Sequence, residues 1–246
     1  MNEITKVLET VKTIHFIGLG GSGMCPLAEI LHSKGYTLQG SDNNESSIVD
    51  RIRKMGIKVM MGQRAENIEG AEIIVYTAAI MNDNPELIAA RNSGVPTVER
   101  ADLLGLITSW FKKAICVTGT HGKTTTTSML SHILLAAETD PTITVGGILP
   151  TIGSNLKIGH SPYFVAEACE YFDSFLQFNP KVGVILNVES DHLDYFEDLA
   201  HIRRIAAATN INAQKEIERR EGYHPALSDS EAELGNLTFS LGDEAR

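Results

Sequence analysis

The residues best suited to chemistry lie in one glycine-containing turn, GTHGKTT, between the apolar stretch AICVTG and a run with helical spacing. Phosphate oxygens require several N–H donors, a mobile ammonium group and an oxygen ligand for Mg²⁺, and this turn supplies all three. Its GxxGKT spacing is shorter than GxxxxGK[ST], because Val117 stands where a glycine is expected. The turn predicts a nucleotide-phosphate site, with a turn of chance composition as the alternative. The candidate nucleotide-binding residues are Gly119, Thr120, His121, Gly122, Lys123, Thr124 and Thr125.

The first glycine turn along the chain, GLGGSG at 18–23, satisfies GxGxxG, follows a strand-like stretch and opens a helix-like one, whereas GTHGKTT at 119–125 is the second. Glycines permit a tight turn whose N–H groups approach phosphate closely, and a helix N-terminus favours negative charge. Asp42 follows the second expected strand, about where a ribose-binding carboxylate is expected. NAD(P), another nucleotide diphosphate and a purely structural turn all remain open here. The candidate substrate-binding residues are Gly20, Gly21, Ser22, Gly23 and Asp42.

Polar side chains also follow two later strands of the expected sheet. Glu167 ends the stretch YFVAE, with Glu170 just beyond it, and His192 comes after VGVILNV with acidic neighbours. Ligands of open α/β sheets gather beyond the carboxyl ends of the strands, so these groups could hold a divalent metal ion beside the GKT turn. A solvated glutamate and an ordinary loop histidine are the alternatives. The residues that could assist are Asp191 and Asp194.

These groups need a scaffold, and strand-like stretches alternate with helix-like stretches of about ten residues along the chain. Strands are expected near 13–18, 37–40, 58–60, 72–76 and 97–98, and a second cycle has strands near 114–119, 163–168 and 182–188. The pattern predicts an α/β protein in which a Rossmann-like parallel sheet precedes a partial P-loop-type α/β domain. We expect the domains to be 1–108 and 109–246, with a less regular tail from about residue 205.

Composition narrows the function classes. Lys and Arg total 21 against 31 Asp and Glu, a formal net charge of −10. Nucleic-acid backbones and anionic membrane surfaces repel so acidic a chain, so we expect neither as a partner. Three widely spaced cysteines form neither a disulfide framework nor a paired CxxC motif, and no stretch resembles a signal peptide or a membrane span. These features predict a cytoplasmic location.

Together the motifs resemble those of the Mur ligases, ATP-dependent amide-forming enzymes of peptidoglycan synthesis. The similar segments are HFIGLGGSGM (15–24), GSD (40–42), YTAAIMNDNPEL (76–87), VPTVERADLL (95–104), GTHGKTTTT (119–127), VAEACEY (165–171) and NVESDHLDYF (187–196). The resemblance covers about residues 10–204, whereas 205–246 match the family poorly. Within the family, the chain is most similar to the enzyme that joins L-alanine to UDP-N-acetylmuramate.

The resemblance implies that the first glycine turn (18–23) binds UDP-N-acetylmuramate and not NAD, and that the second glycine turn (119–125) binds ATP. It implies that Lys123, Glu167 and His192 are catalytic, and that Thr124, Glu167 and His192 hold Mg²⁺. The implied reaction activates the muramoyl carboxylate as an acyl phosphate, which the amine of L-alanine then attacks.

Two alternatives remain within this resemblance: a murein-peptide recycling ligase, and a non-catalytic nucleotide-sugar-binding fragment. Enzymes of the family have three domains, and this chain ends within the second. We therefore expect impaired activity from the chain alone, with a separate chain carrying the missing domain as a partner.

Overall fold

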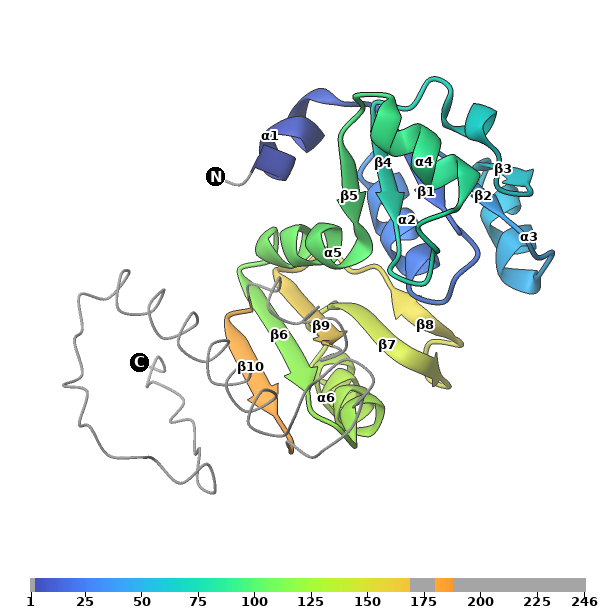
Figure 1. Cartoon of the computed structure of the whole chain (residues 1–246). Coiled ribbons are helices and arrows are strands. Elements are labelled where there is room, and N and C mark those ends of the chain that lie inside the picture. The colour runs from blue at the N-terminus through green and yellow to red at the C-terminus, as the bar shows by residue number, and fades with distance from the viewer. Residues whose placement is uncertain (1–2, 169–179, 188–246) are drawn as a thin grey trace.

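The computed structural model describes residues 3–168 and 180–187, which form two five-stranded sheets in succession along the chain (Figure 1). The predicted α/β fold class is confirmed. His192, Glu170, Asp191 and Asp194 lie outside the described residues, as does the tail from residue 205.

The first sheet has the strand order β3-β2-β1-β4-β5, and all neighbouring strands are parallel. Its strands are β1 (Thr13–Ile17), β2 (Thr37–Asp42), β3 (Lys58–Met61), β4 (Ile73–Tyr76) and β5 (Thr97–Glu99). The accompanying helices are α1 (Glu3–Thr10), α2 (Met24–Ser33), α3 (Ser47–Lys54), the 3₁₀ helix η1 (Ala65–Ile68), α4 (Pro85–Asn92) and α5 (Arg100–Ser109). Because Ile17 pairs with Ser41, the carboxyl ends of β1 and β2 lie at the same edge of the sheet.

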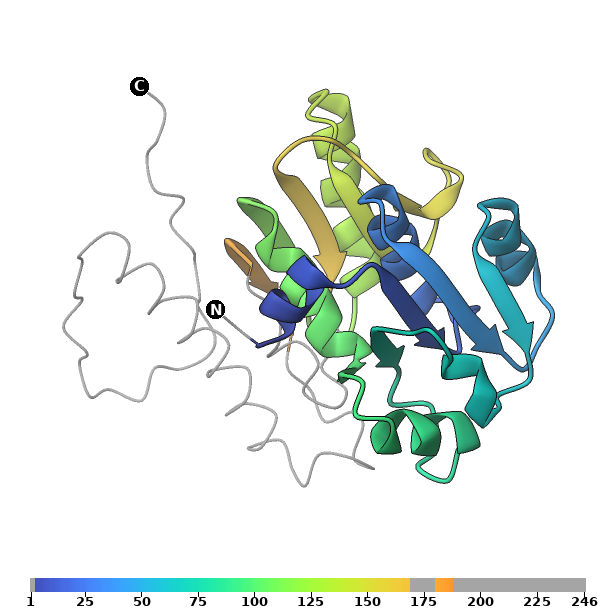
Figure 2. The ribbon, with the colours of Figure 1, turned by 90° about the horizontal axis from the view of Figure 1, so that it is seen from above.

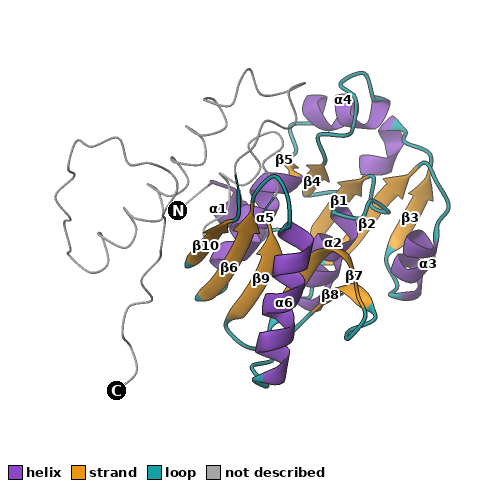
Figure 3. Ribbon diagram, turned by 90° about the horizontal axis from the view of Figure 1, so that it is seen from below, coloured by secondary structure: helices purple, strands orange, loops and turns teal. Residues whose placement is uncertain are grey.

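The second sheet has the order β10-β6-β9-β7-β8, in which only the β7–β8 pair is antiparallel within the described residues. Its strands are β6 (Lys113–Thr118), β7 (Thr142–Leu149), β8 (Ser154–Lys157), β9 (Tyr163–Glu167) and β10 (Val182–Ile185). Helix α6 (Lys123–Ala136) packs on β6, β7 and β9 and covers one face of this sheet (Figure 3).

One apolar cluster joins the two sheets. It includes Phe16 from β1, Leu27 from α2, Leu103 from α5 and Phe164 from β9, all nearly or fully buried. Phe111, two residues after the end of α5, stacks on Phe164 with ring centroids 4.8 Å apart. Burying each such side chain contributes roughly 1.5–3 kcal/mol, so this core holds the sheets side by side with α2 and α5 near their junction (Figure 2).

The sequence did not predict α1 or the β7–β8 hairpin, which are the main differences between expectation and structure. Cys25 and Cys116 are buried in the core, as expected. Burial raises the pKa of the Cys25 thiol to about 12, so it stays protonated at neutral pH and is a poor nucleophile. Within the described residues, no helix combines the length and the apolar character that crossing a bilayer requires.

Candidate functional site

The GKT turn connects the end of β6 to the first residue of α6. Gly119 and Gly122 have φ angles of 137° and 86°, which favour glycine. Because α6 begins at Lys123, the N–H groups of its first turn have no acceptor within the helix. The Lys123 ammonium donates hydrogen bonds to the carbonyl oxygens of Gly119 (2.5 Å) and Thr120 (3.2 Å), so positive charge lies at the centre of the turn.

Asn187, just after β10, holds this turn in shape. Its Oδ1 accepts a hydrogen bond from the backbone N–H of His121 (2.9 Å), and its Nδ2 donates to the His121 carbonyl (3.0 Å). A Cβ at Gly119 would lie 3.1 Å from the Asn187 nitrogen, so the backbones approach closely there. Sequence reasoning missed Asn187, although it follows a strand at the same sheet edge as Glu167 and the same rule applies to it.

Thr124 and Glu167 meet beside the turn. The Thr124 hydroxyl donates to Glu167 Oε2 (3.1 Å), and the backbone N–H of Gly146 in β7 donates to Oε1 (2.7 Å). A Cβ at position 146 would lie 2.7 Å from Glu167 Oε2, so the carboxylate occupies the space that the glycine leaves. The requirement for glycine at 146 was not visible in the sequence.

The structure describes two of the three residues of the predicted metal site. Thr124 and Glu167 are adjacent, and their hydroxyl and carboxylate oxygens are the donors that Mg²⁺ prefers. The third residue, His192, lies outside the described part of the chain. Among residues 3–168 and 180–187 there is no group of three His, Cys, Asp or Glu side chains placed to hold a metal ion.

The first glycine turn follows β1, and its backbone N–H groups donate hydrogen bonds to the end of β2. The N–H groups of Gly18 and Leu19 both donate to the Ser41 carbonyl (2.9 Å each), and the N–H of Gly20 donates to Asp42 Oδ2 (2.9 Å). Asp42 Oδ1 accepts from the N–H of Asn44, so both carboxylate oxygens bond to backbone groups of this chain. In this structure Asp42 therefore shapes the turn.

A buried polar network lies beneath that turn. Glu86, from α4, accepts from the Ser41 hydroxyl through Oε2 (2.6 Å), and its Oε1 lies 2.5 Å from Nε2 of His15. All three residues are fully buried. Asn84 caps α4 by accepting the N–H groups of Glu86 and Leu87, with Pro85 in the first turn, which fixes where Glu86 enters the core. The sequence segment was noted, but the network was not predicted.

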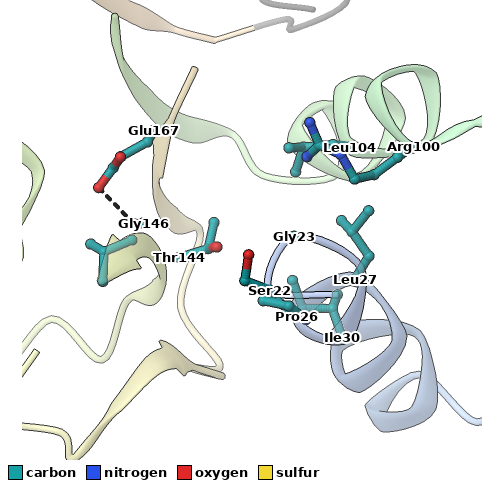
Figure 4. A pocket seen from close by; sticks show the side chains of 11 residues that line it. Ser22, Gly23, Pro26, Leu27, Ile30, Arg100, Leu104, Thr144, Gly146 and Glu167 are labelled. Atoms are coloured by element: carbon teal, nitrogen blue, oxygen red, sulfur yellow. Dashed lines mark hydrogen bonds between the residues drawn. The ribbon is translucent and has the colours of Figure 1, made fainter. Parts of the chain in front are cut away.

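A recess at the junction of the two sheets lies between the first glycine turn and Glu167, the hydrogen-bond partner of Thr124. Ser22 and Gly23 at the start of α2 line it on one side, and Thr144, Gly146 and Glu167 line it on the other (Figure 4). Arg100 and Leu104 of α5 lie along a third side, and the base beside α2 is apolar. The recess measures about 130 Å³, less than the roughly 300–1,000 Å³ of a typical ligand pocket, so it suits one charged group of a larger ligand.

Two family models match consecutive parts of the chain. Residues 13–112 match the model described as "Mur ligase family, catalytic domain" and residues 117–214 match "Mur ligase middle domain". The curated protein named UDP-N-acetylmuramate–L-alanine ligase of Agathobacter rectalis is 56% identical over 191 residues, which are 77% of this chain and 42% of that protein. The protein of the same name from Clostridium beijerinckii is 46% identical over 242 residues, 95% of this chain and 52% of that protein.

The chain thus spans about half the length of these curated relatives. The Clostridium beijerinckii alignment covers 95% of this chain and extends past residue 204, but its 46% identity is an average over the whole alignment, so the poor match expected for 205–246 stays a prediction.

Solved structures are similar as well. The crystal structure of UDP-N-acetylmuramate-alanine ligase MurC from Thermotoga maritima matches with a TM-score of 0.72 and 33% identity, covering 84% of this chain and 47% of that one. The UDP-N-acetylmuramate:L-alanyl-γ-D-glutamyl-meso-diaminopimelate ligase of Neisseria meningitides also gives a TM-score of 0.72, with 29% identity over 80% of this chain and 66% of that one. With both domain models drawn from one family, the chain belongs to the Mur ligases.

Proposed function

We propose that this chain provides the nucleotide-sugar and ATP sites of a ligase that joins L-alanine to UDP-N-acetylmuramate in peptidoglycan synthesis. The observation that carries the proposal is the shared recess, because Ser22 and Gly23 of one glycine turn face Glu167, the hydrogen-bond partner of Thr124 in the other. The names of the two curated relatives indicate the two substrates. In this proposal residues 1–108 bind the nucleotide sugar, and the segment from 109 to 246 carries the ATP site. The protein acts in the cytoplasm.

We assign roles to the second glycine turn on the basis of its geometry. N–H groups of the turn and of the first turn of α6 bind the phosphates of ATP, and Lys123 exchanges its carbonyl partners for phosphate oxygens. Thr124 and Glu167, together with His192, would hold Mg²⁺, which when bound offsets charge on the phosphates. Gly146 and Asn187 position Glu167 and the turn.

In this proposal the first glycine turn binds the other reactant, the nucleotide sugar. Gly20, Gly21, Ser22 and Gly23 surround the diphosphate of the nucleotide sugar, and Asp42 keeps the turn in place. A carboxylate oxygen of the muramoyl group attacks the γ-phosphorus of ATP and ADP leaves, which gives an acyl phosphate. The amine of L-alanine then attacks the acyl carbon, an amide bond forms, and phosphate leaves. Such a reaction depends on charge neutralisation and in-line positioning and needs no covalent nucleophile from the protein.

The first test is isothermal titration of the chain with UDP-N-acetylmuramate and, separately, with MgATP. We expect binding of both, and we expect Lys123→Ala to remove MgATP binding while the nucleotide sugar still binds. Lys113→Ala is the matched control, because Lys113 lies in β6 and contacts Tyr163 instead of the turn. Heat equal to that of buffer with UDP-N-acetylmuramate, or unchanged MgATP affinity in Lys123→Ala, contradicts the proposal.

The second test separates the alternatives. Phosphate release is measured with L-alanine or with the tripeptide L-alanyl-γ-D-glutamyl-meso-diaminopimelate, in the chain alone and in the chain mixed with the remaining C-terminal half of a curated relative. Release that depends on L-alanine supports the proposal. Release only with the tripeptide identifies a recycling ligase, and binding without release in every preparation identifies a nucleotide-sugar-binding fragment.

A further inference from the structure

Arg100 lies against the first glycine turn although it comes from a different element. It is the first residue of α5, and its side chain lines the recess between the sheets (Figure 4). A Cβ at Gly23 would be 3.4 Å from both Cδ and Nη1 of Arg100. The guanidinium group therefore lies directly beside the residue that precedes α2.

The guanidinium group has no ion-pair or hydrogen-bond partner among residues 3–168 and 180–187. Glu99 and Asp102 are its near neighbours in sequence, yet neither forms an ion pair with it. Burial raises the pKa of both carboxyl groups, and the charge of Arg100 offsets only part of that rise at Glu99. In a chain with a formal net charge of −10, a partly buried arginine that forms no ion pair within the described residues is unusual. It is available for an anion from solution.

Two backbone N–H donors lie next to the Arg100 guanidinium group. The N–H groups of Gly18, Leu19, Gly20, Gly21 and Met24 all donate to acceptors within the turn or to β2. The N–H groups of Ser22 and Gly23 donate to no acceptor in the described part of the chain. Both residues are exposed and line the same recess as Arg100.

We propose that Arg100 binds the diphosphate of the nucleotide sugar, together with the N–H groups of Ser22 and Gly23. A guanidinium group offers paired N–H donors that match two phosphate oxygens, and the backbone N–H groups supply the remaining bonds. The inference rests on the proposed function for the nucleotide-sugar site, and it adds a side chain from α5 to a site otherwise made of backbone. Glu167 stands at the opposite side of the recess, so the muramoyl end of the ligand extends from Arg100 towards the ATP site.

The experiment measures the dissociation constants of uridine, UDP and UDP-N-acetylmuramate for the wild-type chain and for Arg100→Ala, Arg100→Lys and Arg91→Ala. Arg91 is the matched control, because it is an exposed arginine on α4 that contacts Asn82 and the Tyr76 ring. We expect Arg100→Ala to weaken UDP and UDP-N-acetylmuramate about 10- to 100-fold, with uridine unchanged. Arg100→Lys should recover part of the loss, and Arg91→Ala should match wild type.

The outcomes distinguish this inference from the proposed function. Equal UDP affinity in wild type and Arg100→Ala overturns the inference while the nucleotide-sugar site stands. Loss confined to UDP-N-acetylmuramate, with UDP unaffected, assigns Arg100 to the muramoyl carboxylate and also overturns it. If the wild-type chain binds neither UDP nor UDP-N-acetylmuramate, the proposed function itself fails. Thermal unfolding of Arg100→Ala should match wild type, since Arg100 has no partner to lose within the described residues.

Discussion

The buried carboxylate of Glu86 supports the first glycine turn indirectly, through Ser41. It holds the Ser41 side chain, while the Ser41 carbonyl accepts the N–H groups of Gly18 and Leu19. A buried group that loses its only partner retains the full cost of desolvation. The geometry of the first glycine turn therefore depends on Glu86 and on its second partner, His15.

Glu86→Ala should lower the free energy of unfolding by about 3 kcal/mol, because it leaves the His15 ring and the Ser41 hydroxyl buried without their acceptor. Glu86→Gln should cost less, since the amide keeps the shape and can still bond to both. Urea unfolding measures both values. Glu66→Ala, in an exposed position of η1, is the control and should stay within about 0.5 kcal/mol of wild type. A cost for Glu86→Ala no larger than the control would contradict the role of the network.

Single residues also show how far sequence reasoning reaches. The structure places Lys123 and Thr124 at the second glycine turn, as their spacing predicts, because their positions relative to that turn are local, whereas their roles stay predictions. Asn187 and Gly146 were missed because their roles arise from contacts with residues distant in the chain. The spacing of a motif is visible in a sequence, whereas the partner that supports it is set by tertiary packing.

Among the elements, all the parallel strands except β7 were predicted, because buried parallel strands are short apolar runs between helices. The β7–β8 hairpin was not, since two adjacent glycines interrupt β7 and its pairing with β8 shifts register there. One of these glycines, Gly146, leaves room for the Glu167 carboxylate. The irregular part of the strand is therefore the part that touches the site.

Gly146→Ala should weaken MgATP binding about tenfold, because the added Cβ would lie 2.7 Å from Glu167 Oε2 and displace the carboxylate. Titration with MgATP gives the affinity. Gly147→Ala is the matched control, since its Cβ would meet only Thr124 Cγ2 at 3.6 Å, an ordinary contact. Equal affinities for the two variants would show that Glu167 does not contribute to the ATP site.

Asp140 joins the two ends of the hairpin. Lys157 foremost, with the backbone N–H and ring of His160, holds the pKa of the Asp140 carboxyl well below its usual range. A lowered folded-state pKa gives stability that is complete above the unfolded pKa of about 3.9 and is lost as pH falls towards the folded value. Thermal unfolding should show Asp140→Asn less stable than wild type at pH 7, with the difference shrinking below about pH 4. A difference that grows on acidification would contradict this assignment.

At the scale of the molecule, the two sheets share one apolar core and also meet through polar contacts. The Asn155 side chain donates to the Ser22 carbonyl and Arg51 donates to the Ser154 hydroxyl, both at 3.5 Å. The hairpin of the second sheet therefore contacts the first glycine turn. The sequence indicated two α/β units but not their packing, because the residues that join them are spread over α2, α5 and β9.

The central claim is that the two glycine turns serve one reaction across a common recess. A crystal structure of the chain with UDP-N-acetylmuramate and a non-hydrolysable ATP analogue tests it most directly. We expect the sugar diphosphate beside Ser22, Gly23 and Arg100, the γ-phosphate beside Lys123 and Thr124, and the muramoyl carboxylate between them near Glu167. Ligands bound at separate surfaces, with the carboxylate directed away from the γ-phosphate, would contradict the claim.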